Sequence, residues 1–236
     1  MDRLCIIRQA EAKSHIEAYN NLPLYETGSW LSKPVQTVME LLPLLEKNQS
    51  FRALDLGCGV GRNSIPVAQH FCHTSCRVDC VDILAMAIEK LNENAREYGV
   101  SNAIQGIVAS IDSYEIEPES YDFIMAISAL EHVDSETGFV RKLEQIRNGL
   151  RAGGIACLIV NTDVREWDKT TGRERAAQFE VNLKTEKMQG IMKRIFSDWQ
   201  TVKHTVAHQK YDVPREDGMV TLETDVVTYV IRKTES

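Results

Sequence analysis

Between residues 50 and 162, short apolar runs alternate with segments of helical periodicity, and this alternation limits the possible folds more than any other feature of the sequence. The apolar runs are 51–56, 77–82, 104–110, 121–128 and 153–162. The helical segments between them are 63–71, 84–99 and 135–150. Strands that are apolar almost throughout need cover on both faces, so the pattern predicts a parallel sheet between two layers of helices.

The two ends of the chain follow a different pattern. Residues 1–47 contain helical stretches joined by a loop, and we expect a helical cap there on a main domain of residues 48–236. Residues 163–182 are predicted to form a long polar loop. The strands predicted at 201–209 and 220–232 flank the turn PREDG with no helix between them, so they should form an antiparallel hairpin. The expected fold is therefore α/β, with a Rossmann-like, doubly wound, mostly parallel seven-stranded sheet and an antiparallel C-terminal hairpin.

Length and charge exclude several classes of protein. The chain has 236 residues and a formal net charge of −7, which suits one globular domain with a modest extension. Residues 162–236 carry 13 acidic and 13 basic side chains, whereas residues 1–161 carry 21 acidic and 14 basic ones. Because non-specific duplex binding needs several basic side chains on one face, nucleic acid is not expected as a partner. No run reaches the roughly 18 apolar residues of a membrane span and the N-terminus lacks a signal-peptide core, so we expect a cytoplasmic protein without a membrane partner.

Six cysteines raise the question of a metal site. Cys72, Cys76 and Cys80 lie close to His70 and His73 in the segment HFCHTSCRVDC. Structural zinc sites usually contain paired C-x2–4-C units that supply four converging ligands, whereas Cys80 falls inside a predicted strand and Cys72 at the end of a predicted helix. We therefore expect free thiols and no metal, with zinc as the alternative.

The stretch ALDLGCGVGRNSIPVA, residues 53–68, joins the first predicted strand to a helix through three glycines. The dinucleotide fingerprint G-x-G-x-x-G would place its third glycine at position 62, but Arg62 stands there and the third glycine is Gly61. Asp55, two residues before the first glycine, would repel a pyrophosphate and suits a ligand with an ammonium group. Both departures argue against a nicotinamide-dependent oxidoreductase.

Two further positions indicate what this loop binds. Pro66 is tolerated in the first turn of a helix, so the helix should begin near residues 62–65 and offer its N-terminus to a carboxylate. Asp82 ends the second predicted strand 21 residues after Gly61, about the spacing at which an acidic residue reaches ribose hydroxyls, although it could also merely cap the next helix. A site with an amino-acid end and a ribose end favours S-adenosylmethionine as its ligand.

Four segments, in order, resemble the motif series of class I S-adenosylmethionine-dependent methyltransferases: LDLGCGVGRNSIPVA, VDCVDILAMAIEKL, ASIDSYEIEPESYDFIMAISALEHV and LRAGGIACLIVN. The later segment SDWQTVKHTV and the closing hairpin look most similar to the tellurite-resistance methyltransferase group. The resemblance implies S-adenosylmethionine as cofactor and transfer of its methyl group to a small-molecule acceptor, of unidentified structure, by in-line displacement.

The resemblance also implies roles for individual residues. Asp55 would orient the amino group of the cofactor, Asp82 would accept bonds from the ribose hydroxyls, and Ser128 would flank the methyl group. Asp112 would contact the adenine amino group, unless it is simply a turn aspartate. The full set of implied cofactor-binding residues is Asp55, Gly57, Gly59, Gly61, Asp82, Ile83, Ile111, Asp112, Ile127 and Ser128.

A sulfonium methyl group is already activated, so such an enzyme mainly has to align the reacting atoms and exclude water. A general base is unnecessary for an anionic nucleophile and helpful for a hydroxyl or an amine. His132, just beyond the fourth strand, is the candidate catalytic residue, with a surface or helix-capping histidine as the alternative.

Residues 20–32 and 163–182 are expected to close over the site. The candidate substrate-lid residues are Tyr25, Trp30, Asn161 and Arg165. A protein that binds S-adenosylmethionine as a sensor or scaffold, without methyl transfer, is the alternative function.

Overall fold

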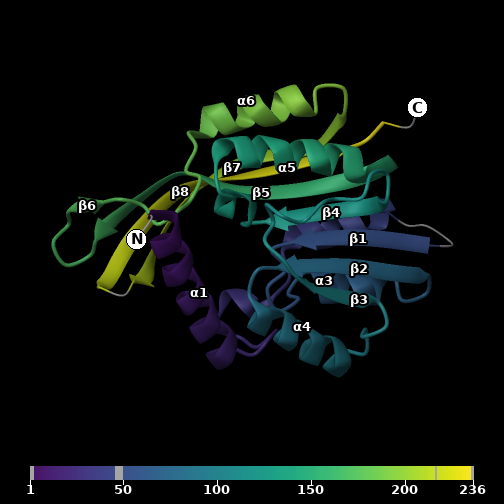
Figure 1. The fold of residues 1–236 in the computed structure, drawn as a ribbon, viewed down its shortest axis with the longest axis horizontal. Coiled ribbons are helices and arrows are strands. Elements are labelled where there is room, and N and C mark those ends of the chain that lie inside the picture. Colours follow the sequence, from purple (N-terminus) through teal and green to yellow (C-terminus); the bar gives the residue numbers. More distant parts are fainter. Residues whose placement is uncertain (1–2, 46–49, 216, 235–236) are drawn as a thin grey trace.

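Eight strands form one mixed sheet in the computed structural model, which describes residues 3–45, 50–215 and 217–234 (Figure 1). Seven of them follow the order β3-β2-β1-β4-β5-β8-β7, and the short β6 pairs with β5. The strands are β1 (Ser50–Leu56), β2 (Ser75–Asp82), β3 (Ile104–Val108), β4 (Tyr121–Ile127), β5 (Leu150–Asp168), β6 (Glu174–Arg175), β7 (Gln200–Arg215) and β8 (Gly218–Arg232). The pairings of β1 to β5 with one another are parallel, while β8 pairs antiparallel with β5 and β7. The predicted fold class is confirmed, with β6 as an additional strand.

Helices cover both faces of the sheet, as the apolar strands require. They are α1 (Arg3–Asn21), η1 (Trp30–Ser32), α2 (Gln36–Leu41), η2 (Leu42–Leu45), α3 (Ser64–His70), α4 (Ala85–Glu97), η3 (Leu130–His132), α5 (Glu136–Gly149) and α6 (Thr185–Ile195). One core cluster joins α2, α3 and α4 to the strand residues Phe51, Ala53 and Val78. The other joins α5 and α6 to Leu54 and Leu56 of the same strand β1. Alternate residues of β1 therefore enter opposite cores.

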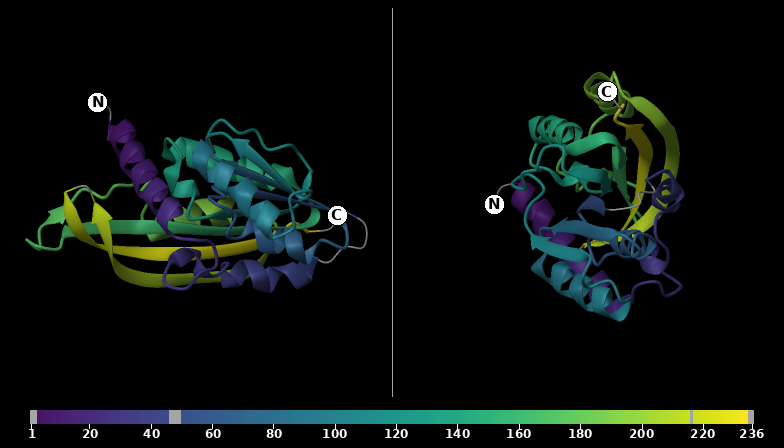
Figure 2. Two further views of the ribbon diagram at one scale, coloured as in Figure 1. Left: turned by 90° about the horizontal axis from the view of Figure 1, so that it is seen from below. Right: turned by 90° about the vertical axis from the view of Figure 1, so that its right-hand side faces the viewer.

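The topology fixes where a ligand can bind. Strand β1 lies between β2 and β4, so the chain reverses its direction of travel across the sheet when it passes from β3 to β4. In open α/β sheets the loops on either side of such a switch point diverge and leave a crevice beyond the carboxyl ends of the strands. Helix α1 crosses this end of the parallel strands (Figure 1), and the view from below shows it rising away from the sheet (Figure 2).

The long polar loop predicted at 163–182 is only partly a loop. Strand β5 continues to Asp168 past a register shift between Thr162 and Arg165, and together with β6 and β8 it extends beyond the core (Figure 1). Asp163, with φ of 48°, lies at this irregularity. The sequence did not predict this continuation of β5 because the residues that face inward there are not all apolar. Among them is Glu166, a charged residue that is buried and paired with Arg215. Likewise, β7 and β8 are longer than predicted, and residue 216 of the turn PREDG lies outside the described residues.

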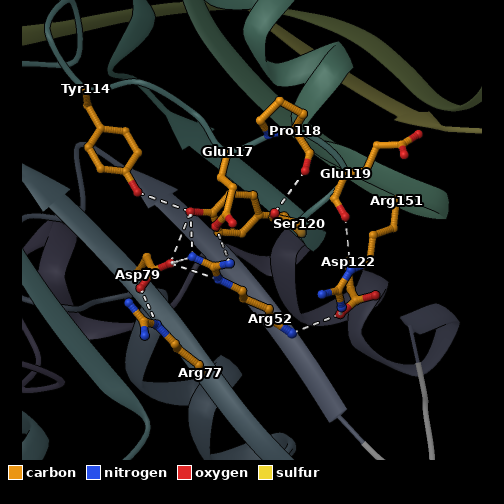
Figure 3. A network of polar contacts seen from close by, with 11 residues as sticks. Arg52, Arg77, Asp79, Tyr114, Glu117, Pro118, Glu119, Ser120, Asp122 and Arg151 are labelled. Carbon is orange, nitrogen blue, oxygen red and sulfur yellow. Dashed lines mark hydrogen bonds and ion pairs between the residues drawn. The ribbon is translucent and has the colours of Figure 1, made fainter.

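Near the amino ends of the parallel strands, a network of charged side chains ties β1, β2 and β4 together (Figure 3). Asp79, almost fully buried, accepts hydrogen bonds from the guanidinium group of Arg52, from Nε of Arg77 and from the hydroxyl of Tyr121. Arg52 also pairs with Glu117. Donors from Arg52, Arg77 and Tyr121 compensate the negative charge of the buried Asp79 carboxylate. The cluster therefore stabilises the sheet at the end away from the crevice.

The N-terminal helices lie where the sequence predicted them, as α1 and α2. The predicted boundary between cap and main domain, at residues 47 and 48, lies outside the described residues. No helix in the described part of the chain is long and apolar enough to cross a membrane.

Candidate active site

A pocket of about 850 Å³ lies between α1 and the loops that follow the parallel strands. Gly57 follows β1, Ile83 follows β2, Ser110 follows β3 and Ser128 follows β4, and each of them lines the pocket. The crevice expected at the switch point is therefore present. Its volume falls in the upper part of the range of small-molecule sites, roughly 300–1,000 Å³.

The glycine loop forms part of the floor, in a backbone conformation that favours glycine. Gly57, Gly59 and Gly61 have φ values of 75°, 52° and 94°. A Cβ atom at Gly57 would lie 2.6 Å from Cβ of Ala129, and one at Gly59 would lie 2.6 Å from the hydroxyl of Tyr19. Only Gly57 of the three lines the pocket among the described residues. The glycines thus permit close packing of the loop against β4 and α1 as well as close approach of a ligand.

Asp82 lines the pocket and also fixes the glycine loop. One carboxylate oxygen accepts a bond of 2.9 Å from the backbone N–H of Gly59, and the other accepts one of 2.9 Å from that of Leu84, at the start of α4. The local anchoring role and the ligand-facing position predicted from the sequence are therefore compatible. Each carboxylate oxygen has a second lone pair, so the residue can still accept bonds from a ligand.

Asp55 lies deeper than the sequence suggested. It is 1% exposed, is not among the described residues that line the pocket, and accepts a bond of 2.5 Å from the hydroxyl of Ser64 at the start of α3. Burial raises the pKa of the Asp55 carboxyl to about 7, although the bond from Ser64 opposes the shift. In this conformation Asp55 secures the strand to the helix below the glycine loop and does not contact the pocket.

The remaining predicted cofactor residues divide into two groups. Ile83, Ile111 and Ser128 line the pocket, and Ser128 has a φ of 50°, an uncommon backbone conformation for a residue other than glycine. Ile127 and Asp112 are not among the described lining residues. The carboxylate of Asp112 instead accepts a bond of 3.1 Å from the backbone N–H of Asp134, which agrees with the alternative of a structural aspartate.

His132 lines the pocket and is held by two carboxylates. Its Nδ1 atom lies 2.9 Å from Oε2 of Glu11, on α1, and 2.9 Å from Oε2 of Glu180, in the segment before α6. Burial alone would lower the pKa of His132, but the hydrogen bonds with Glu11 and Glu180 outweigh it and hold the pKa well above its usual range. The three side chains come from distant parts of the sequence, so only folding brings them together.

Helix α1 supplies most of the opposite wall. The described lining residues that it contributes are Leu4, Cys5, Arg8, Gln9, Glu11, Ala12, His15 and Tyr19. Sequence reasoning missed all of these, although a signal was available: Arg8, Glu11, His15 and Tyr19 follow one another at intervals of three or four residues and so share one helix face. Burial beside Asp82 raises the pKa of the Tyr19 phenol, which therefore stays protonated.

The predicted lid residues Tyr25, Trp30, Asn161 and Arg165 are not among the described residues that line the pocket. The hydroxyl of Tyr25 donates to the backbone oxygen of Arg62, and the amide of Asn161 donates to the buried carboxylate of Glu131. The ring of Trp30 packs beside the rings of His15 and Tyr19, and Arg165 is exposed. In the described structure α1 forms this wall of the pocket, and residues 163–182 contribute only Glu180 to the described lining, so a lid built from these four side chains stays a prediction.

The arrangement also bears on metal binding. Among the described His, Cys, Asp and Glu side chains, Glu11, His132 and Glu180 are close enough to share a cation, with their ligand atoms within 4.8 Å of one another. Cys80 is buried inside β2 whereas Cys72 is exposed, so these two thiols lie in different environments. All six cysteines are free.

Comparisons with known proteins agree with this geometry. A family model described as a methyltransferase domain matches residues 53–154, which run from β1 into β5. Sterol 24-C-methyltransferase of Candida albicans is 23% identical over 136 residues, or 58% of this chain and 35% of that protein. The mouse (Mus musculus) tRNA N(3)-cytidine methyltransferase METTL2 is 30% identical over 114 residues, or 46% of this chain and 28% of that protein. The chain thus spans about a third of the length of these curated relatives.

Among solved structures, TehB from Haemophilus influenzae superimposes with a TM-score of 0.62 at 19% identity, covering 85% of this chain and 62% of TehB. At this identity the likeness is one of fold. The matched domain includes β1, the glycine loop, Asp82 and β4, which are the elements that form the pocket floor. Residues 53–154 therefore match a methyltransferase domain, within a fold that the chain shares with TehB.

Proposed function

We propose that this protein transfers the methyl group of S-adenosylmethionine to a small molecule bound in the pocket beneath α1. The observation that carries the proposal is the position of that pocket, at the carboxyl ends of β1 to β4 and directly above the glycine loop. When bound there, S-adenosylmethionine would supply a methyl group that is already activated on sulfur.

The residues present fit this cofactor. Gly57 leaves the floor open where a side chain would collide with Ala129, and Asp82 has lone pairs left for ribose hydroxyls. The side chain of Ile83 is 54% exposed, and together with Ile111 it offers an apolar surface for an aromatic base. Burying such exposed apolar area against a ligand contributes favourably to binding. We propose the same cofactor contacts as the sequence resemblance implies for these four residues and for Ser128.

His132 is proposed to contact the acceptor. Its Nδ1 atom is held by Glu11 and Glu180, so the ring is fixed and Nε2 is the nitrogen left for another partner. The walls formed by α1 and the strand loops restrict water around the reacting atoms, which an in-line displacement needs. Proton removal by His132 would require its loss of the proton that the two carboxylates stabilise, so any base role strengthens as pH rises.

The curated relatives leave the class of acceptor open. The name of one refers to a sterol and that of another to a tRNA cytidine, so nucleic acid, which the charge distribution argued against, has to be included in a screen. The pocket itself, with its volume of about 850 Å³, suits a small molecule beside the cofactor.

Two measurements test the proposal. Calorimetry should show binding of S-adenosylmethionine and S-adenosylhomocysteine, with nicotinamide dinucleotides much weaker. A screen of thiols, amines, hydroxyl compounds, metalloid oxyanions and tRNA should then detect S-adenosylhomocysteine formation with a small molecule. Tighter binding of a nicotinamide dinucleotide would refute the cofactor assignment. Binding of S-adenosylmethionine with no transfer to any acceptor would favour the sensor or scaffold function.

A further inference from the structure

The pocket carries more negative than positive charge. Its described lining includes four carboxylates and two cationic side chains: Glu11, Asp82, Asp134 and Glu180 against Arg8 and His132. His15 adds no charge, because burial lowers its pKa. The net charge of this lining is therefore −2 when His132 is protonated and −3 when it is neutral.

Both cations are already engaged with carboxylates. Arg8 forms an ion pair with Asp134 and lies 3.5 Å from Glu180 and 3.6 Å from Asp112. His132 is shared between Glu11 and Glu180. An anionic acceptor would thus find no unpaired cation among the described lining residues, and it would have to leave water for an acidic wall.

The pocket lining also contains apolar side chains around this acidic group. Described residues of this kind are Leu4, Cys5 and Ala12 on α1, and Ile111 and Ala129 on the strand side. A surface of this type suits the carbon skeleton of an organic molecule, since burying it removes apolar area from water on both partners. The pocket therefore combines an apolar wall with carboxylates that accept hydrogen bonds.

We propose that the methyl acceptor is an organic amine that binds as its ammonium ion, with the charged nitrogen beside Glu11 and Glu180 and its carbon skeleton on the apolar wall. Before transfer, the ammonium group gives one proton to Nε2 of His132 in its neutral form. The freed nitrogen lone pair then forms the bond to the methyl carbon while the electrons of the carbon–sulfur bond stay on sulfur. This inference rests on the proposed function, because it concerns the acceptor of that reaction. S-adenosylmethionine has one more positive than negative group, so with it bound the described lining retains an excess negative charge that an ammonium group offsets. An ammonium group also offers three N–H donors to carboxylate oxygens that retain free lone pairs.

A divalent cation is the competing occupant of the same carboxylates, since Glu11, His132 and Glu180 lie within reach of one another. Two observations favour the ammonium ion. The hydrogen bonds to Nδ1 of His132 already use a proton that a metal would have to displace. A metal ion would also leave unused the apolar wall formed by Leu4 and Ala12 on the facing helix.

Three probes of matched size test the proposal by calorimetry: hexylamine, which is an ammonium ion at neutral pH, hexanol and hexanoate. Each is titrated into the free protein and into the protein saturated with S-adenosylhomocysteine. We expect hexylamine to bind more tightly than hexanol, and hexanoate most weakly. Glu11→Gln and Glu180→Gln should each weaken hexylamine about tenfold or more, the scale of a hydrogen bond to a charged group, while hexanol binding stays the same. Glu144→Gln, at an exposed position of α5, serves as the matched control and should change neither.

Several results would overturn the proposal. Equal binding of hexanol and hexylamine would show that the pocket does not recognise charge, and tighter binding of hexanoate would show that it prefers anions. Binding of magnesium or manganese chloride that expels hexylamine would assign the carboxylates to a metal. A loss of hexanol binding in both Gln variants would show that Glu11 and Glu180 only hold the wall together. The titrations into free protein do not require cofactor, so they remain informative even if S-adenosylhomocysteine fails to bind and the proposed function is wrong.

Discussion

Replacing Asp82 by alanine tests the link between the glycine loop and the cofactor. In the free protein Asp82 accepts one bond from Gly59 and one from Leu84, both at 2.9 Å. Hydrogen bonds to a charged group contribute about 1.5–3 kcal/mol each, but water can replace them at this half-buried position, so we expect unfolding to become easier by about 2 kcal/mol in total. The affinity for S-adenosylhomocysteine should fall by a further amount of about 1–3 kcal/mol, a factor of roughly 5 to 150 in Kd, through the loss of bonds to ribose.

A double-mutant cycle with the ligand separates the direct contact from the loosening of the loop. The 2′-deoxy analogue of S-adenosylhomocysteine should bind the unmodified protein more weakly than the parent compound does. In Asp82→Ala the two compounds should bind almost equally, because the partner of the 2′-hydroxyl is gone. Calorimetry gives the four affinities, and thermal unfolding of the same samples confirms that the variant is folded. The ribose assignment is wrong if the deoxy analogue loses the same affinity in both proteins.

Two other predictions concern the pH dependence of stability and the network around Asp79. Because the pKa of His132 is raised in the folded protein, its ion pair with Glu11 stabilises the fold fully below the unfolded pKa of about 6.5, and this contribution disappears as pH rises through the folded value. The difference in unfolding free energy between the unmodified protein and Glu11→Gln should therefore be largest near pH 6 and shrink in alkaline solution; a difference that grows with pH would contradict this. Asp79→Asn should lower the free energy of unfolding by about 3 kcal/mol, since it leaves the partly buried Arg52 without its main partner, but should not change the affinity for S-adenosylhomocysteine. A large loss of affinity would show that the network in Figure 3 is coupled to the pocket.

The parts of the fold that the sequence predicted are those set by local pattern. Strand β1, the glycine loop and α3 follow from an apolar run, three glycines and a proline tolerated in the first helical turn. Asp82 could be placed because its position relative to Gly61 is fixed by one helix and one strand. Such predictions succeed since each element's periodicity reports directly on which faces are buried.

Contacts between distant segments were not predictable in this way. Glu11 and Glu180 meet at His132 although 169 positions separate them along the chain. Glu166 was assigned to a loop because a charged residue usually indicates solvent, yet it is buried beside Arg215. In both cases the charge of a side chain is compensated by a partner that the local sequence does not reveal.

Helix α1 shows why hydrophobic periodicity alone does not identify a pocket wall. Its pocket face, with Arg8, Glu11, His15 and Tyr19, is mostly polar, so no apolar stripe indicates which side is covered. Only Ile7 and Tyr19 are buried in this helix, and its attachments to the main domain are largely ion pairs and hydrogen bonds. Partly exposed ion pairs stabilise little, so α1 should be among the segments that open most easily. The pocket lies beneath it, and the Tyr19 hydroxyl lies against Gly59 of the glycine loop. A wall of this kind can line a charged site, and we expect its displacement to expose little hydrophobic surface of the helix, which an apolar helix could not combine.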